Sequence, residues 1–290
     1  MTKTATLRSV TQVAASAATL EGGGVLVHRA FPNGALDSLD PFLLLDEMGP
    51  LEMTPGKTTG FPDHPHRGFE TVTYLLEGQF EHRDSFGNRG LIEPGGVQWM
   101  TAGSGLVHSE MPGPEIARNG GRLHGFQLWV NLPRSAKMAQ PKYQELAAGK
   151  IPAAAAGGVR AKVIAGEALG VQAAIGTHTP IQYVHFTLEP GALQVHPVPR
   201  RYHAFAYVFG GSARLGGALA SRGDLAVFGP DGDAVEIANA GEGPLDLLLI
   251  AGEPIGEPVA RYGPFVMNTR EELYQAFEDF RAGRMGAIDR

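Results

Sequence analysis

Short runs of β-branched and aromatic residues, separated by glycine, proline, aspartate or asparagine, recur along most of this 290-residue chain. The clearest runs cover residues 70–76, 97–101, 126–130, 183–188, 204–209 and 244–251. Runs of this length and composition, with turn-forming residues between them, predict β-strands. Their regular recurrence is typical of an all-β barrel or sandwich.

The C-terminal region has a different pattern. Thr269 and Glu272 have the spacing of a capping box, in which each side chain accepts a hydrogen bond from the backbone N–H of the other residue. Leu273, Phe277 and Phe280 then follow at helical spacing. The sequence therefore predicts one short helix over 270–282, packed on the outside of the β-structure.

The two halves of the chain resemble each other. His64 precedes Gly78 by the same spacing as His196 precedes Gly210, and each interval ends in a predicted strand. Further on, both halves place a glycine turn directly before an apolar strand. Internal similarity of this kind predicts a duplicated domain. We expect one barrel in residues 1–145 and a second in 159–290, which also includes the helix, with the alanine-rich stretch 150–158 as a linker.

Composition agrees with this reading and excludes several classes of protein. The 40 glycines and 21 prolines fit many tight turns between short strands. The chain has no cysteine, which excludes disulfides, thiolate ligands and a cysteine nucleophile. Its net charge of -6 argues against direct binding to nucleic acid. Neither a signal peptide nor an apolar stretch of membrane-spanning length is evident, so we expect a soluble, cytoplasmic protein without membrane contacts.

Four side chains of metal-ligand type lie in two pairs, each with one residue between its members. His64 and His66 form one pair, and His108 and Glu110 form the other. Because strand side chains alternate between faces, two such pairs on neighbouring strands would direct four ligand atoms at one point. Three neutral nitrogens and one anionic oxygen suit iron, manganese, nickel, copper or zinc. Such a metal would keep open positions for a substrate.

The duplicated halves are not chemically equal at these positions. Aligned by eye, only His64 keeps a histidine partner, His196. The other aligned pairs are His66 with Val198, His108 with Glu236 and Glu110 with Ala238. A metal site needs several ligands at once, so the second barrel is predicted to have lost its site.

The segment His64-Pro-His-Arg-Gly-Phe-Glu70 resembles the first motif of the cupin superfamily, and the chain as a whole resembles the pirin family. The matching segments are 39–47, 60–78, 98–103, 107–112, 128–132 and 257–268. This resemblance implies a bicupin with one mononuclear iron(II) site in the N-terminal barrel, held by His64, His66, His108 and Glu110. Manganese, nickel, copper, cobalt or zinc are the alternatives for the metal.

The resemblance also implies two kinds of function. One is a quercetin 2,3-dioxygenase, which would open a flavonol or similar small aromatic substrate with dioxygen; Glu110 would then act as the general base on the 3-hydroxyl. The other is a redox-sensing regulatory protein, acting through protein partners as a transcription coregulator or as a regulator of a metabolic enzyme. Glu70 occupies the position that supplies a carboxylate ligand in many other cupins, and we expect it to support an imidazole or border the pocket.

Several other residues have two readings. Trp99, Met100, Phe126 and Trp129 are either core residues or walls of a substrate cavity, because alternate strand residues face into a barrel. Arg67 and Gln98 either orient a substrate or satisfy backbone carbonyls. The glycine-rich stretches show no phosphate-loop pattern, and we expect them to be turns.

Overall fold

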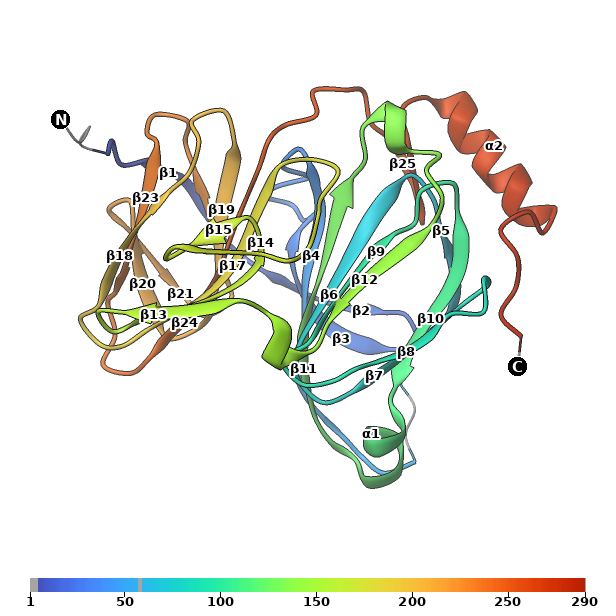
Figure 1. Ribbon diagram of the computed structural model, residues 1–290, viewed down its shortest axis with the longest axis horizontal. Coiled ribbons are helices and arrows are strands. Elements are labelled where there is room, and N and C mark those ends of the chain that lie inside the picture. Colours follow the sequence, from blue (N-terminus) through green and yellow to red (C-terminus); the bar gives the residue numbers. More distant parts are fainter. Residues whose placement is uncertain (1–4, 57–58, 290) are drawn as a thin grey trace. The chain divides into compact units, whose positions relative to one another are not determined.

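A computed structural model describes residues 5–56 and 59–289, and the chain in it divides into two compact units (Figure 1). The first, called the N-barrel here, comprises Ala18–Arg29, Phe42–Lys150 and Ile255–Arg290. The second, called the C-barrel, comprises the N-terminal segment up to Ala17 together with Ala30–Pro41 and Ile151–Pro254. Both units consist mainly of antiparallel strands, which confirms the all-β prediction.

The N-barrel is built from two antiparallel sheets. The seven-stranded sheet has the order β12 (Lys142–Leu146), β9 (Val97–Thr101), β6 (Phe69–Glu77), β11 (Gly121–Asn131), β4 (Phe42–Met53), β3 (Val25–Phe31) and β2 (Ala17–Glu21). The four-stranded sheet has the order β5 (Phe61–His66), β10 (Leu106–Pro112), β7 (Phe80–Asp84) and β8 (Arg89–Ile92). Apolar residues of both sheets, such as Val27, Leu75 and Phe80, pack into one buried cluster. Each sheet thus buries one face against the other.

The C-barrel repeats this plan. Its seven-stranded sheet has the order β1 (Val10–Ala15), β22 (Asp224–Phe228), β19 (His203–Gly210), β24 (Leu245–Gly252), β17 (Ile181–Leu188), β14 (Val159–Ala165) and β13 (Ala153–Ala156). Its four-stranded sheet has the order β18 (Leu193–Pro197), β23 (Ala234–Asn239), β20 (Ser212–Leu215) and β21 (Ala218–Ser221). A buried apolar cluster again joins the two sheets. The matching strand orders support the duplication inferred from the sequence.

The division of the chain differs from the expected boundaries in three places. Strand β1 pairs with β22 and closes the edge of the C-barrel sheet that β12 closes in the N-barrel. The C-terminal segment from Ile255 onward belongs to the N-barrel. The stretch expected as a linker contains β13, which pairs with β14. Sequence order alone does not reveal that a segment from one end of the chain belongs to the barrel formed by the other half. The barrel to which an edge strand belongs depends on the strand with which it pairs in the folded chain.

The C-terminal segment adds a hairpin and a helix to the N-barrel. Strands β25 (Ala260–Tyr262) and β26 (Phe265–Met267) form the hairpin, and α2 (Arg270–Arg281) follows it. Thr269 and Glu272 form the predicted capping box at the start of α2. Leu273 and Ala276 of the helix are buried in a cluster with Phe265. The helix predicted over 270–282 is therefore present, within one residue of its predicted end.

Gly68 explains how the hairpin approaches the strand that carries His66. Its φ is +86°, and a Cβ atom at this position would lie 1.9 Å from the carbonyl oxygen of Val266. Only glycine tolerates both the backbone conformation and the close contact. The buried ammonium of Lys137 then links the carbonyls of Gly68 and Val266 by hydrogen bonds of 2.9 and 3.0 Å.

The remaining elements are short. They are α1 (Pro114–Asn119), the 3₁₀ turns η1 (Arg134–Ala136) and η2 (Ala148–Lys150), and the two-stranded pair β15 (Glu167–Ala168) and β16 (Val171–Gln172). No helix within residues 5–56 and 59–289 is long and apolar enough to cross a bilayer.

Candidate metal centre

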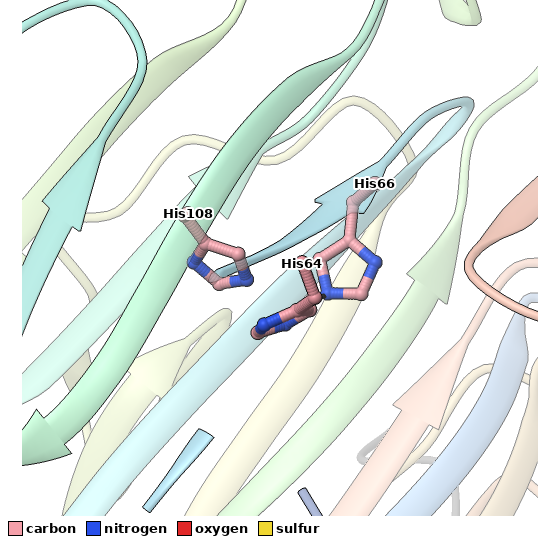
Figure 2. A group of neighbouring side chains, drawn as sticks. All are labelled: His64, His66 and His108. Atoms are coloured by element: carbon pink, nitrogen blue, oxygen red, sulfur yellow. Dashed lines mark hydrogen bonds between the residues drawn. The ribbon is translucent and has the colours of Figure 1, made fainter. Parts of the chain in front are cut away.

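Three of the four predicted ligands meet at one point in the N-barrel. His64 and His66 come from β5, and His108 comes from β10, which pairs with β5 so that His108 lies opposite His64 (Figure 2). One nitrogen from each ring lies within 4.8 Å of the corresponding atoms of the other two. The i, i+2 spacing on β5 puts both of its imidazoles on the same face, as the alternation of strand side chains requires. This group of residues could hold a metal ion.

The protonation of the rings fits metal binding. Nδ1 of His64 lies 2.7 Å from the carbonyl oxygen of Pro62 and donates its proton to it, which directs Nε2 toward the other two rings. That Nε2 faces Nε2 of His66 at 3.1 Å, while Nε2 of His108 is buried without a hydrogen bond. Burial and the neighbouring imidazoles lower the pKa of both His66 and His108 well below the ordinary value. Neutral imidazoles with inward lone pairs are the form that binds a divalent metal.

Glu110 lines the same cavity as His64 and His66 but lies outside the three-ring group. Its Oε1 accepts a hydrogen bond of 2.7 Å from the Thr73 hydroxyl, and its Oε2 accepts one of 2.9 Å from the Gln127 amide. Burial raises the pKa of the Glu110 carboxyl, and these hydrogen bonds oppose that effect. A carboxylate has about four lone-pair directions, so each oxygen can still meet a metal or a substrate proton.

A cavity of about 430 Å³ opens beside these side chains. Leu44, Met48, Phe61 and Trp129 supply apolar walls. At the same cavity, Arg29 forms ion pairs with Asp46 at 2.7 Å and with Glu21 at 2.8 Å. The cavity therefore combines a nitrogen-rich group with a largely apolar wall and a paired set of charges, the composition typical of a small-molecule site.

Trp129 connects the cavity wall to the histidines. Its ring centroid lies 5.1 Å from that of His66 and 4.4 Å from that of Phe69. The guanidinium of Arg261 lies 4.9 Å from the Trp129 ring centroid and donates a hydrogen bond of 2.8 Å to the Leu43 carbonyl. Contacts with His66, Phe69 and Arg261 thus fix the orientation of the indole.

A second set of polar residues lies behind His108. Nδ1 of His82, on β7, lies 3.5 Å from Nδ1 of His108, and the His82 ring packs against Tyr143 with centroids 4.6 Å apart. Burial lowers the pKa of His82 to about 4. His82 is therefore a neutral ring that supports the orientation of a ligand ring.

Two family profiles match the chain: pirin over residues 24–130 and the pirin C-terminal cupin domain over residues 183–286. The chain belongs to the pirin family. It is 46% identical to human pirin over 271 residues, which cover 92% of this chain and 90% of that protein. It is 48% identical to pirin-like protein 2 of Arabidopsis thaliana over 275 residues, covering 92% and 82% of the two chains. The resemblance inferred from the sequence is confirmed.

Solved structures agree with the fold of this pirin-family protein. A quercetin 2,3-dioxygenase from Acinetobacter baumannii superposes with a TM-score of 0.92 at 35% identity, covering 98% of this chain and all of that one. The bacterial pirin YhhW from Escherichia coli, in complex with nickel(II), superposes with a TM-score of 0.64 at 22% identity, covering 86% and 99%. The second likeness supports the two-cupin fold.

Glu70 of this pirin-family protein does not lie where the sequence reading put it. Along β6, Thr73 lies on the same face as Glu110 and Gln127, which line the cavity, so the alternation of strand side chains turns Glu70 to the opposite face of the sheet. There Oε1 of Glu70 accepts a hydrogen bond of 2.7 Å from the Thr101 hydroxyl. Burial raises the pKa of Glu70 to about 7. The expected role beside an imidazole or at the pocket wall is therefore not supported.

The residues with two readings are also resolved. Of the four residues Trp99, Met100, Phe126 and Trp129, Trp129 alone is among the described residues that line the cavity. Met100 packs in a small buried cluster with Leu106. Arg67 donates to the Ser104 carbonyl and pairs with Asp279, and Gln98 donates to Glu145. Both polar residues therefore have structural partners.

Sequence reasoning missed Thr73, Gln127 and His82. Thr73 and Gln127 are ordinary strand residues whose roles depend on the pairing of β6 with β11, where they lie opposite each other. His82 carried a weak signal, because His82 and Asp84 repeat the i, i+2 spacing of the ligand pairs on another strand. That signal becomes informative only when β7 is known to pair with β10.

The register of the C-barrel corrects the alignment made by eye. His196 on β18 lies opposite Val235 on β23, just as His64 lies opposite His108. The counterpart of His108 is therefore Val235 and not Glu236, which pairs with Val195. Val235 and Ile237 both belong to the buried apolar cluster of this barrel. The shift of one residue leaves apolar side chains where the N-barrel has ligands.

Proposed function

We propose that this pirin-family protein is a metal-dependent dioxygenase that opens a flavonol such as quercetin, with iron(II) held by His64, His66 and His108. The observation that carries the proposal is the cluster of three imidazoles beside a cavity with largely apolar walls. The likeness to a quercetin 2,3-dioxygenase over nearly the whole chain, at 35% identity, supports the choice of substrate. The nickel(II) complex of the bacterial pirin YhhW supports the binding of a divalent metal by this fold.

Glu110 has two roles in this proposal: it is the fourth ligand, and it is the base that takes the proton of the 3-hydroxyl. The hydroxyl of Thr73 and the amide of Gln127 hold one carboxylate oxygen each, which limits its rotation and keeps it directed at the cavity. Such positioning is what general-base catalysis requires. When bound, the metal ion supplies Lewis acidity toward the substrate oxygen and an electron source for dioxygen chemistry.

The walls of the cavity would position the flat rings of the substrate. Trp129, held by contacts with Arg261 and His66, contributes apolar surface to the cavity, and Leu44, Met48 and Phe61 close the space around it. Burial of the substrate rings would exclude water from the reacting carbon atoms. Arg29 is already paired with Asp46 and Glu21, so it adds little net charge and the cavity suits an uncharged polyphenol.

The proposal is tested by direct turnover. The protein is reconstituted anaerobically with iron(II), mixed with quercetin and dioxygen, and followed by the loss of flavonol absorbance together with the release of carbon monoxide. The His66→Ala variant serves as the metal-free control, and His28→Ala, outside the three-ring group, is the matched control. Lack of metal-dependent turnover with several flavonols would reject the proposal.

A second candidate function, regulation through a protein partner, is favoured by a surface groove of the N-barrel. The groove, of about 490 Å³, lies along α2 and β25. Tyr262 and Tyr274 line the groove and are 71% and 70% exposed. Arg261, Arg270 and Arg281 line the groove together with Glu278, which pairs with Arg281, so three positive charges face one negative charge. Exposed aromatic and arginine side chains are the usual anchors of protein interfaces.

The occupant that fits this groove is an extended, acidic segment of a partner protein with apolar side chains. In the described part of the chain, β25 is paired with β26 alone, so its second edge can accept a strand. The ion pair between Arg67, next to His66, and Asp279 of α2 joins the metal-binding strand to the helix. A change at the metal would in this way reach the partner surface.

Fluorescence polarisation tests this second candidate. A labelled octapeptide of alternating glutamate and leucine should bind, and the matching lysine–leucine peptide should not. Arg270→Glu should weaken binding about tenfold, because it reverses one charge, whereas Arg214→Glu on β20 should have no effect. The titration is repeated with iron(II) and iron(III) protein, and equal affinities would reject a redox-sensing role.

A further inference from the structure

The C-barrel contains a cavity of its own, of about 550 Å³, beside β18. Strand β18 holds the same place in the four-stranded sheet of this barrel as β5 holds in the N-barrel. The duplication has therefore kept a cavity next to this strand, although His196 is the one ligand-type side chain that remains and apolar residues replace the other three ligands. The chemistry of the remaining lining residues indicates what the cavity could bind.

Two buried polar atoms at this cavity have no hydrogen-bond partner. His196 is 1% exposed, and its Nε2 atom makes no hydrogen bond. Gln182, on β17, donates from its amide nitrogen to the Pro197 carbonyl at 3.2 Å, while its buried Oε1 atom accepts nothing. Buried polar atoms are nearly always satisfied in native proteins, so two unpaired atoms at one cavity point to a missing partner.

The other polar groups around the cavity narrow the class of that partner. Glu167 and Asp233 contribute carboxylates, and Asp233 also accepts a hydrogen bond of 2.7 Å from the backbone N–H of Thr6 and interacts with the charge of Arg8. Among the described residues that line the cavity there is no lysine or arginine. Leu169 and Val198 supply apolar surface. Carboxylates and an amide oxygen only accept hydrogen bonds, so the cavity repels anions and favours a ligand that donates hydrogen bonds and carries positive charge.

We propose that the C-barrel binds a small organic cation, an amine on a short hydrocarbon frame, with Gln182 and His196 at the floor of the site. The ammonium donates hydrogen bonds to Oε1 of Gln182 and attracts the carboxylates of Glu167 and Asp233. The hydrocarbon part packs against Leu169 and Val198. This site is separate from the metal centre in its residues and in the charge that it selects, and it does not depend on the proposed dioxygenase activity.

NMR titration with three matched probes tests the proposal. The full-length protein is loaded with zinc, which causes no paramagnetic broadening, and the side-chain amide signal of Gln182 is followed. Benzylamine, benzyl alcohol and benzoate have nearly the same shape but carry positive, zero and negative charge. We expect a saturable shift with benzylamine, a weaker one with benzyl alcohol and none with benzoate.

Two variants check the assignment. Gln182→Leu should weaken benzylamine binding roughly three- to tenfold, because one hydrogen bond is lost. Since this variant has no Gln182 amide signal, its binding is measured from the ring signal of His196. Gln172→Leu, the same substitution on exposed β16 outside this cavity, should leave the affinity unchanged. The proposal is overturned if benzylamine gives no saturable shift, if benzoate binds as well as benzylamine, or if the two variants behave alike.

Discussion

The guanidinium of Arg67 lies 2.6 Å from the carboxylate of Asp279 and joins the residue after a metal ligand to the C-terminal helix. The side chains are 6% and 15% exposed, so the pair is largely shielded from solvent. Burial by itself would raise the pKa of Asp279, but hydrogen bonds from Arg67, Gln275 and Arg284 outweigh it and lower the pKa to about 2. The contact therefore holds α2 against the strand that carries His66.

Removal of one partner from this pair should destabilise the protein. Asp279→Asn leaves the Arg67 charge buried without its counter-ion, and the expected loss is about 3 kcal/mol of unfolding free energy. Urea unfolding measures the effect. The matched control is Glu278→Gln, which removes the exposed partner of Arg281 and should change stability by less than about 0.5 kcal/mol. Similar losses in both variants would contradict a structural role for the buried pair.

Replacement of Glu110 by glutamine should separate metal binding from proton transfer. The amide can accept a hydrogen bond from Gln127 and donate one to the Thr73 hydroxyl, so the side chain keeps its place. We expect most of the metal to remain bound and flavonol turnover to fall about 10²- to 10⁴-fold. Metal analysis and steady-state kinetics measure the two effects. Unchanged turnover would exclude Glu110 as the base.

Thr73→Val offers a milder change at the same carboxylate. It removes one of the two donors to Glu110 but keeps the shape of the side chain, so turnover should fall less than in Glu110→Gln. The pH dependence of turnover should also shift, because a hydrogen bond that favours the charged carboxylate is lost. A pH profile identical to that of the unmodified protein would argue against the positioning role of Thr73.

Metal should stabilise the folded protein through the three-histidine cluster. A ligand that binds only the folded state adds about 2.7 kcal/mol at a concentration one hundred times its Kd. Thermal unfolding with and without iron(II) should show this gain in the unmodified protein and in His28→Ala, and not in His66→Ala. An equal gain in His66→Ala would mean that the metal binds elsewhere.

The buried His196 should make the C-barrel sensitive to mild acid. Burial lowers its pKa to about 4, below the ordinary value near 6.5, so the unfolded chain binds the proton more readily. Stability is therefore complete above pH 6.5 and is lost as the pH falls toward 4, by an amount on the order of 3 kcal/mol. Urea unfolding between pH 4 and 7 should show a smaller loss for His196→Phe. Parallel curves for both proteins would contradict this assignment.

Much of the site could be predicted because its signal is local. His64 and His66 face the same way in any strand, and the same holds for His108 and Glu110, so alternation alone selected these residues. The residues near Glu70 in the sequence could not show on which face of the sheet its side chain lies. The face of β6 that is turned to the cavity is known only from the pairing of Thr73 with Gln127. For the same reason the register of β23 against β18, which puts Val235 opposite His196, escaped an alignment by eye.

The sequence by itself determined the strands, the capped C-terminal helix, the duplication and the ligand types, since each depends on residues close together in the chain. Tertiary structure decided which edge each strand occupies, so that β1 closes the C-barrel and α2 belongs to the N-barrel. It also decided which donors hold Glu110 and which partner Arg67 finds in Asp279. These contacts join residues far apart in sequence, and only the packing of strands in three dimensions brings them together.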